Sequence, residues 1–205
     1  MNAKNEDRSL IAAPRLLPGQ LDRVAQTALV ADIRSVLTKA PLFAQTTARG
    51  QKLSVQMSSA GTLGWVSDRH GYRYEPQHPS GTAWPPIPER LLTLWRDLLP
   101  DARTPESCLI NYYTADARMG LHQDRDEADL TQPVLSISLG DDALFRFGTS
   151  HSRSPTRSVW LSSGDVVILE GPSRLAYHGI DRLREGSSTL FSRPGRVNLT
   201  LRVVT

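Results

Sequence analysis

Two histidines and one aspartate in the second half of the chain have the residue types of a metal site. His122 and Asp124 lie two positions apart in a segment, 120–124, that has the character of a strand end. Side chains two apart in a strand project from the same face, so both can bind one ion. With His178 they would form the facial triad of a non-haem Fe(II) site, which leaves coordination positions open. His-x-Asp alone is more often a surface ion pair, so the hypothesis requires a co-substrate site.

A candidate co-substrate site lies near the end of the chain. In residues 196–203, apolar residues alternate with Arg196, Asn198, Thr200 and Arg202. This period of two predicts a strand with one apolar and one polar face. At about 3.3 Å per residue the two arginine Cα atoms would lie roughly 20 Å apart, and their long side chains can lean inward around a short diacid. An edge strand with a solvated basic face is the alternative.

A second short strand offers neutral polar groups to the same ligand. In Leu109-Ile110-Asn111-Tyr112-Tyr113, Asn111 and Tyr113 share one face by the same parity argument. They can add hydrogen bonds to the diacid, although the pair alone is uninformative.

The elements that must position these residues follow from the apolar pattern. Helical spacing predicts helices over 20–39 and 88–99. Residues 1–19 form an irregular lead-in, and residues 50–87, rich in Gly, Pro, Ser and aromatics, are expected to hold short strands and loops. From residue 107 onward, turn signals separate short strands. The predicted strands cover 53–57, 109–113, 120–124, 134–139, 144–147, 158–161, 166–169 and 197–203. The pattern indicates an α+β domain with helices early and a β sandwich or barrel late.

The composition is that of a globular protein. The chain has 205 residues, of which 39% are hydrophobic and 22% charged, and a net charge of +3. It has no apolar run near the roughly 20 residues of a membrane span, and the polar segment Met1–Ser9 has no secretory pattern. The single Cys108 fits a reducing compartment, so we expect a cytoplasmic protein without membrane association. Of 24 basic residues 21 are arginine, a weak indication of anionic partners.

Together these motifs resemble the AlkB family of Fe(II)- and 2-oxoglutarate-dependent dioxygenases in order and spacing, from about residue 54 to 202. The segments that carry the resemblance are Leu63-Gly64-Trp65, Gly71-Tyr72-Arg73-Tyr74, Cys108-Leu109-Ile110-Asn111, His122-Gln123-Asp124-Arg125-Asp126-Glu127, Ser136-Ile137-Ser138-Leu139-Gly140, Gly164-Asp165-Val166-Val167, Ser173-Arg174-Leu175, Tyr177-His178-Gly179-Ile180 and 196–202.

The resemblance implies a single dioxygenase domain over 1–205. A double-stranded β-helix (jelly-roll) core would span about 107–205, preceded by N-terminal helices and a nucleotide-recognition lid over about 45–87. It implies one Fe(II) per subunit and O2 and 2-oxoglutarate as co-substrates. The implied iron ligands are His122, Asp124 and His178, and the implied 2-oxoglutarate contacts are Asn111, Tyr113, Arg196, Asn198 and Arg202.

The implied reaction is direct-reversal repair of alkylated bases such as 1-methyladenine and 3-methylcytosine. It would release succinate, CO2 and an aldehyde. The substrate would be DNA, with single strands preferred and RNA as a second candidate, and the enzyme a monomer. The implied substrate contacts are Met57, Ser58, Trp65, Tyr72, Asp126, Glu127 and Arg153.

Some of these contacts have a physical argument of their own. A base must leave its stack to react, and Trp65 would then cover its face. Asp126 and Glu127 would attract the positive charge of an N-methylated base, and Asp126 is also a candidate partner for a C-terminal arginine.

The chain departs from the family's pattern at two points. A gap-free alignment with the bacterial family member puts Ser152 at a substrate-contacting Arg, so Arg153 takes that role by a one-residue slip. Leu169 stands where that member has a Trp near the iron. Two other hypotheses remain open: the same chemistry on proteins or small metabolites, and a nucleic-acid-binding module without catalysis.

Overall fold

The computed structural model describes residues 11–153 and 155–205. The polar segment Met1–Ser9, in which the sequence shows no secretory pattern, therefore lies outside the described residues. The helices are α2 (Arg23–Lys39), α3 (Glu89–Leu98) and the short 3-10 helix η1 (Gly171–Ser173). The strands are β1 (Arg15–Leu17), β2 (Phe43–Thr46), β3 (Lys52–Gly61), β4 (Gly64–Asp68), β5 (Gly71–Glu75), β6 (Ser107–Tyr113), β7 (Met119–His122), β8 (Val134–Gly140), β9 (Asp142–Phe147), β10 (Arg157–Leu161), β11 (Val166–Leu169), β12 (His178–Arg184) and β13 (Arg196–Arg202).

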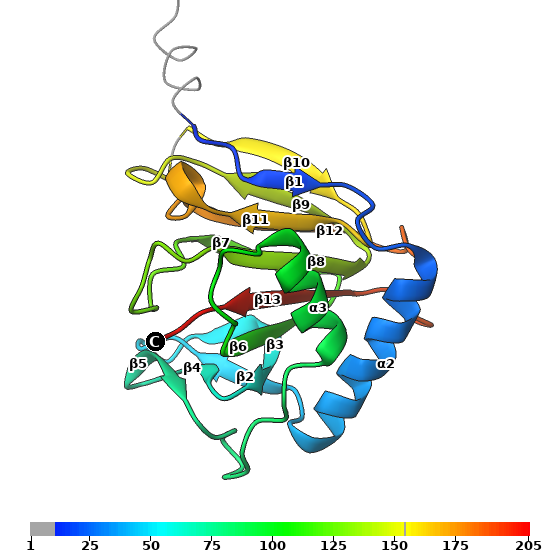
Figure 1. Cartoon of the computed structure of the whole chain (residues 1–205), viewed down its shortest axis with the longest axis vertical. Helices are drawn as coiled ribbons and strands as arrows, with labels where there is room; N and C mark the ends of the chain where they lie inside the picture. Colours follow the sequence, from blue (N-terminus) through cyan, green and yellow to red (C-terminus); the bar gives the residue numbers. More distant parts are fainter. Residues whose placement is uncertain (1–10, 154) are drawn as a thin grey trace, which may run out of the picture.

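The strands form two larger sheets and one small one. The major sheet has seven strands in the order β1-β11-β8-β13-β6-β3-β2, and the minor sheet has four in the order β10-β9-β12-β7. Their pairings are antiparallel. Strands β4 and β5 pair only with each other, as a separate hairpin (Figure 1). The predicted α+β class with a jelly-roll core is confirmed.

One hydrophobic cluster attaches the two helices to the outer face of the major sheet. Leu29, Ile33 and Val36 recur at helical spacing in α2 and pack in the same cluster as Trp95 of α3. The sheet contributes alternate residues of β6, β8, β11 and β13, such as Leu199. Asp22 caps α2, because its carboxylate accepts a hydrogen bond from the backbone N–H of Ala25 at 2.8 Å. Figure 1 shows both helices on one side of the molecule.

A second cluster fills the space between the two sheets. It joins Val55 and Leu109 of the major sheet to Phe145 and Phe147 of the minor sheet. Because side chains alternate along a strand, the residues of β13 that do not face the helices face this space instead. The polar residues of β13 therefore enter the interior of the sandwich.

The predicted elements were largely confirmed, with differences at the edges. The helix predicted over 20–39 begins at Arg23, and the strand predicted over 120–124 ends at His122, so Asp124 lies in the following loop. β1, β2 and β12 were not predicted; β1 was read as irregular lead-in because three residues carry too little pattern. Among the described residues, no helix is long and apolar enough to cross a membrane.

Candidate functional site

The two histidines and the aspartate converge where β7 meets β12. These antiparallel strands place His122 directly opposite His178, and Asp124 follows two residues after the end of β7. One ligand atom from each of the three side chains lies within 4.8 Å of the others. The Nε2 atoms of both histidines are 3.7 Å from Asp124 oxygens, one histidine on each oxygen. The arrangement is that of a facial triad.

Backbone carbonyls orient both imidazole rings. Nδ1 of His122 lies 2.9 Å from the Gly120 carbonyl oxygen, and Nδ1 of His178 lies 2.9 Å from that of Ala176. A carbonyl can only accept, so each Nδ1 carries the proton and each Nε2 presents its lone pair toward Asp124. Burial, aided by His122, lowers the pKa of His178 to about 4, so this ring is neutral at pH 7 as a metal ligand must be.

The Asp124 carboxylate is buried and ionised. Burial by itself raises its pKa, but Arg202 and the two histidines outweigh that effect and hold the pKa well below its usual range. Arg202 Nη2 is 2.9 Å from Asp124 Oδ2. Even so, Oδ2 has no donor in hydrogen-bond geometry among the described residues. Two imidazole nitrogens and a carboxylate that retains an acceptor oxygen fit a divalent iron ion.

Arg196 carries a buried charge that is poorly compensated. It is 1% exposed, and Nη2 donates to the Ser138 hydroxyl at 3.1 Å. Its Nε and Nη1 have no hydrogen-bond partner within the described part of the chain. Burial lowers its pKa, against the influence of Tyr113, whose ring centroid lies 5.0 Å from the guanidinium carbon. Two buried donors on an uncompensated cation fit a carboxylate of a small ligand.

Neutral polar groups fill the space between the two arginines. The amide of Asn198 donates to the Ser136 hydroxyl at 2.7 Å and to a backbone carbonyl at 3.0 Å. Its oxygen accepts from Thr200 at 3.0 Å and faces the Asn111 amide at 3.5 Å. Strand β13 lies between β6 and β8, so the edge-strand alternative is wrong. Asn111 and Tyr113 line the same pocket as Arg196 and Arg202, as parity predicted.

Comparisons with known proteins agree with this geometry. Residues 14–202 match the model of the 2OG-Fe(II) oxygenase superfamily. An alpha-ketoglutarate-dependent dioxygenase AlkB homolog of Caulobacter vibrioides is 54% identical over 186 residues, covering 90% of this chain and 84% of the relative. The AlkB dioxygenase of Escherichia coli K12 is 40% identical over 180 residues, covering 85% of this chain and 82% of the relative.

The chain belongs to the AlkB family of Fe(II)- and 2-oxoglutarate-dependent dioxygenases. The structure of OsALKBH1 superposes with a TM-score of 0.80 at 31% identity, covering 92% of this chain and 95% of that one. As a member of this family the protein is an enzyme that uses Fe(II), 2-oxoglutarate and O2. Its triad and its buried arginines fit the first two.

Two aromatic side chains line the outer end of the pocket, which is the end away from the metal triad. The pocket has a volume of about 670 Å³ and extends from the triad and β13 to Trp65 on β4 and Tyr72 on β5. The two rings stack, with centroids 5.3 Å apart and planes inclined by 20°. Trp65 Nε1 donates to Asp126 at 3.0 Å, which ties the hairpin to the loop that carries Asp124. Tyr72 is 54% exposed.

The structure corrects two expectations for the acidic loop. Asp126 was a candidate partner for a C-terminal arginine, but it bonds Trp65, and it is Asp124 and Glu127 that lie beside Arg202. Glu127 was expected to attract a charged base, and it does line the pocket. Its carboxylate is instead buried and engaged by Arg174, Arg202 and the Tyr74 hydroxyl.

A third correction concerns β3. Met57 lines the pocket, but Ser58 points to the opposite face, where its hydroxyl donates to the Ala40 carbonyl at 2.7 Å. Adjacent residues of a strand cannot share a face, which excludes Ser58 from the pocket. Arg153 lines the pocket, with its guanidinium carbon 5.5 Å from the centroid of Tyr177, and Leu169 is also a wall residue.

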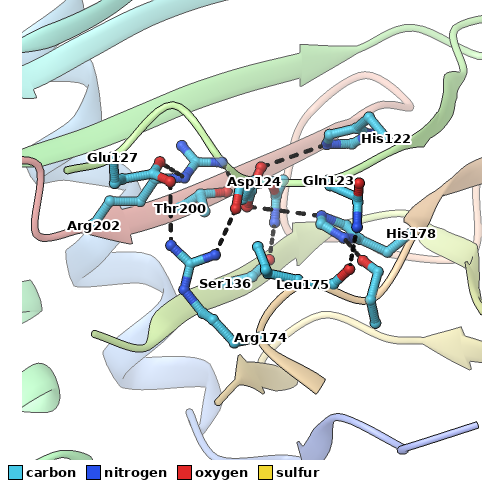
Figure 2. A network of polar contacts seen from close by, with 12 residues as sticks. His122, Gln123, Asp124, Glu127, Ser136, Arg174, Leu175, His178, Thr200 and Arg202 are labelled. Carbon is cyan, nitrogen blue, oxygen red and sulfur yellow. Dashed lines mark hydrogen bonds and ion pairs between the residues drawn. The ribbon is translucent and has the colours of Figure 1, made fainter. Parts of the chain in front are cut away.

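Sequence reasoning assigned no role to several residues that complete the site. Thr200 was on the polar face of the alternating segment, so the signal for it was present. Tyr74 and Arg174 lay within the quoted motifs, but nothing in their spacing shows which groups they bond. Gln123 anchors the same loop by donating to the carbonyls of Ser150 at 2.9 Å and Leu175 at 2.6 Å. Figure 2 shows Gln123 with Leu175, and Arg174 with Asp124 and Glu127.

Proposed function

We propose that the enzyme oxidatively dealkylates N-alkylated bases such as 1-methyladenine and 3-methylcytosine in DNA, and also in RNA, and thereby reverses alkylation damage directly. One observation carries the proposal: a single pocket joins the metal triad to a stacked aromatic pair, Trp65 and Tyr72, and to the carboxylate of Asp126 beside Trp65. Relatives named AlkB in Caulobacter and Escherichia coli support it, as does a human relative named nucleic acid dioxygenase ALKBH1.

In this proposal His122, Asp124 and His178 hold Fe(II), and Arg196 and Arg202 hold the carboxylates of 2-oxoglutarate. Asn111, Tyr113 and Asn198 add neutral hydrogen bonds around the co-substrate. Bound iron supplies the oxidising chemistry, using O2 and the oxidative decarboxylation of 2-oxoglutarate to succinate and CO2.

The base would enter from the hairpin. A base reacts at its edge only when it is extruded from its stack, and it then needs an aromatic surface. Trp65 would supply that surface, and Asp126 a nearby negative charge for the cationic N-methylated ring. Met57 would border the base, while Tyr72 and Arg153 at the pocket mouth would contact the backbone. Hydroxylation of the alkyl carbon leaves an unstable product that releases an aldehyde, formaldehyde in the case of a methyl group.

The organisation of the chain follows from these roles. We assign residues 107–205 to the catalytic core and about 45–87 to the lid, within one domain over 1–205. The enzyme would act as a monomer, since one chain supplies every group of the pocket. It would prefer single strands, because flipping costs least there. A cytoplasmic location agrees with a single, buried, unpaired cysteine, Cys108.

The test is a turnover assay with a short strand containing 1-methyladenine, Fe(II) and 2-oxoglutarate, in which formaldehyde and succinate are measured together. Equal amounts of both products that depend on O2 would support the proposal. Succinate without formaldehyde would mean a dioxygenase whose substrate lies elsewhere, among proteins or metabolites. The absence of both products from folded, metal-loaded enzyme would overturn it.

A further inference from the structure

Four buried charged residues form a closed ring that includes Asp124 of the metal triad (Figure 2). Arg174 Nη1 donates to the backbone carbonyl of Asp124 at 2.6 Å, and Nη2 donates to Glu127 Oε2 at 3.1 Å. Glu127 Oε1 is 3.3 Å from Arg202 Nε, and Arg202 Nη2 is 2.9 Å from Asp124 Oδ2. The ring holds two cations and two anions, so its formal charge is zero.

Arg174 is the most firmly held member of this ring. In addition to its two ring contacts, its Nε donates to the Gln132 carbonyl at 2.6 Å, and its side chain is almost fully buried. The residue follows η1, where Ser173 and Glu170 exchange capping hydrogen bonds. A planar guanidinium with three directed bonds holds its neighbours in fixed geometry, which a lysine cannot do. Arg174 therefore fixes the backbone of the Asp124 loop.

Glu127 determines how the charge of Arg202 is distributed. Arg202 lies between two carboxylates, one of which, Asp124, is a metal ligand in the proposed site. Without Glu127, the full attraction of Arg202 would fall on Asp124 and compete with a metal for the same oxygen. Arg174 in turn neutralises Glu127, and the Tyr74 hydroxyl donates to Glu127 Oε1 at 2.6 Å. Arg174 and Glu127 thus balance the charges of Asp124 and Arg202.

We propose that Arg174 and Glu127 are positioning residues that fix the Asp124 loop and divide the charge of Arg202, so that Asp124 remains available to the metal. The proposal rests on the assignment of His122, Asp124 and His178 as metal ligands. Groups that orient metal ligands from behind typically contribute 10- to 100-fold to metal affinity or activity. The expected effect is therefore on metal binding itself.

The experiment is an anaerobic titration with Fe(II) alone, read by isothermal titration calorimetry and repeated with Co(II), an oxidation-resistant probe whose binding is also read by visible absorption. Arg174→Lys keeps the positive charge but loses the planar fork, and Glu127→Gln keeps the shape but loses the charge. Each is expected to weaken metal binding by about 10- to 100-fold while circular dichroism shows a native fold. In Glu127→Gln the KM for 2-oxoglutarate should also rise, because Arg202 shifts toward Asp124.

Arg15→Lys is the matched control. Arg15 also contacts a carboxylate, Glu170 at 3.0 Å, and a carbonyl, Leu98 at 3.0 Å, and Glu170 begins the same η1 segment. It has no contact with Asp124 or Arg202. A purely structural effect on this segment would appear in the control as well, whereas the proposal predicts unchanged metal affinity there.

The outcomes separate this proposal from the assignment on which it rests. If the unmodified enzyme does not bind Fe(II), the metal assignment fails, and the ring with it. If the unmodified enzyme binds Fe(II) but folded Arg174→Lys and Glu127→Gln bind it equally well, only the role of the ring is overturned. Should a single variant unfold, the double variant Glu127→Gln/Arg174→Gln, which removes one charge of each sign, replaces it, and unchanged metal affinity there overturns the proposal equally.

Discussion

At the inner end of the pocket Arg196 and Arg202 project from β13, which is paired with β6 and β8 along its whole length. At the outer end Trp65 and Tyr72 project from a hairpin whose strands pair only with each other. The charges of the inner end are buried: Arg202 is paired with Asp124 and Glu127, whereas Arg196 has no carboxylate partner in the described part of the chain. The ion pairs of the hairpin, between Arg73 and the carboxylates of Asp68 and Glu75, are only partly buried.

This difference follows the demands of the two ligands. A small diacid and an ion have one shape, so a rigid, desolvated site can be built around them, and weakened solvation strengthens each charged contact. A flipped base on a strand must enter and leave, and the hairpin that would receive it pairs with neither larger sheet among the described residues. Substitutions at the inner end are therefore expected to change turnover or co-substrate binding. Substitutions in the hairpin are expected to change the affinity for the nucleic acid.

The largest effect is expected for Asp124→Ala. The substitution removes one of three ligands from an open metal site, so turnover should fall below detection in the succinate and formaldehyde assay. The fold should remain, since Asp124 lies in a loop and Arg202 keeps Glu127 as a buried carboxylate partner. His122→Ala removes a ligand with a more exposed side chain and serves for comparison. Turnover retained by Asp124→Ala would mean that the triad is misassigned.

Arg196→Met is expected to have a smaller effect on function than Asp124→Ala and to make the protein more stable. Hydrogen bonds to charged groups contribute about 1.5–3 kcal/mol, so the KM for 2-oxoglutarate should rise roughly 10- to 100-fold. Because the buried Arg196 lacks a carboxylate partner in the described part of the chain, an apolar side chain of similar length should raise the free energy of unfolding, measured in urea without co-substrate, by about 1 kcal/mol.

Arg184→Met is the control for that stability measurement. Arg184 is an exposed arginine paired with Asp142 at 3.0 Å, so its replacement should leave both the stability and the KM nearly unchanged. A loss of stability in Arg196→Met comparable to that of other core substitutions would show that the arginine is retained for the fold.

The inner end could be predicted from the sequence because its residues obey a simple period. Alternation along β13 predicted that Arg196, Asn198, Thr200 and Arg202 share a face, and burial of that face followed once β13 proved to be central. Asp124 was predicted to lie beside His122 for a partly wrong reason, since it lies in a loop and not in the strand. Arg174 and Gln123 orient that loop through contacts to backbone carbonyls, which no side-chain pattern encodes.

The outer end was harder to predict. Local alternation in β3 separates Met57 from Ser58, yet the sequence alone did not reveal which of the two faces the pocket. The pairing of Trp65 with Asp126 spans 61 positions, and that of Tyr74 with Glu127 spans 53. Such pairs depend on how a hairpin lies over a distant loop, which is decided by tertiary packing and not by propensity.

The smallest effect is expected for Trp65→Ala, and it should be confined to the nucleic acid. Stacking of a base on an aromatic side chain contributes about 1–3 kcal/mol, so affinity for a 1-methyladenine strand should fall by that amount while KM for 2-oxoglutarate stays constant. Trp65→Phe keeps a ring but loses the donor to Asp126, so it should retain most of the affinity if stacking dominates. Trp160→Ala, on β10 of the minor sheet, is the control. Equal losses in Trp65→Ala and Trp65→Phe would instead assign the role of Trp65 to its hydrogen bond, and the hairpin would then act by holding the Asp126 loop.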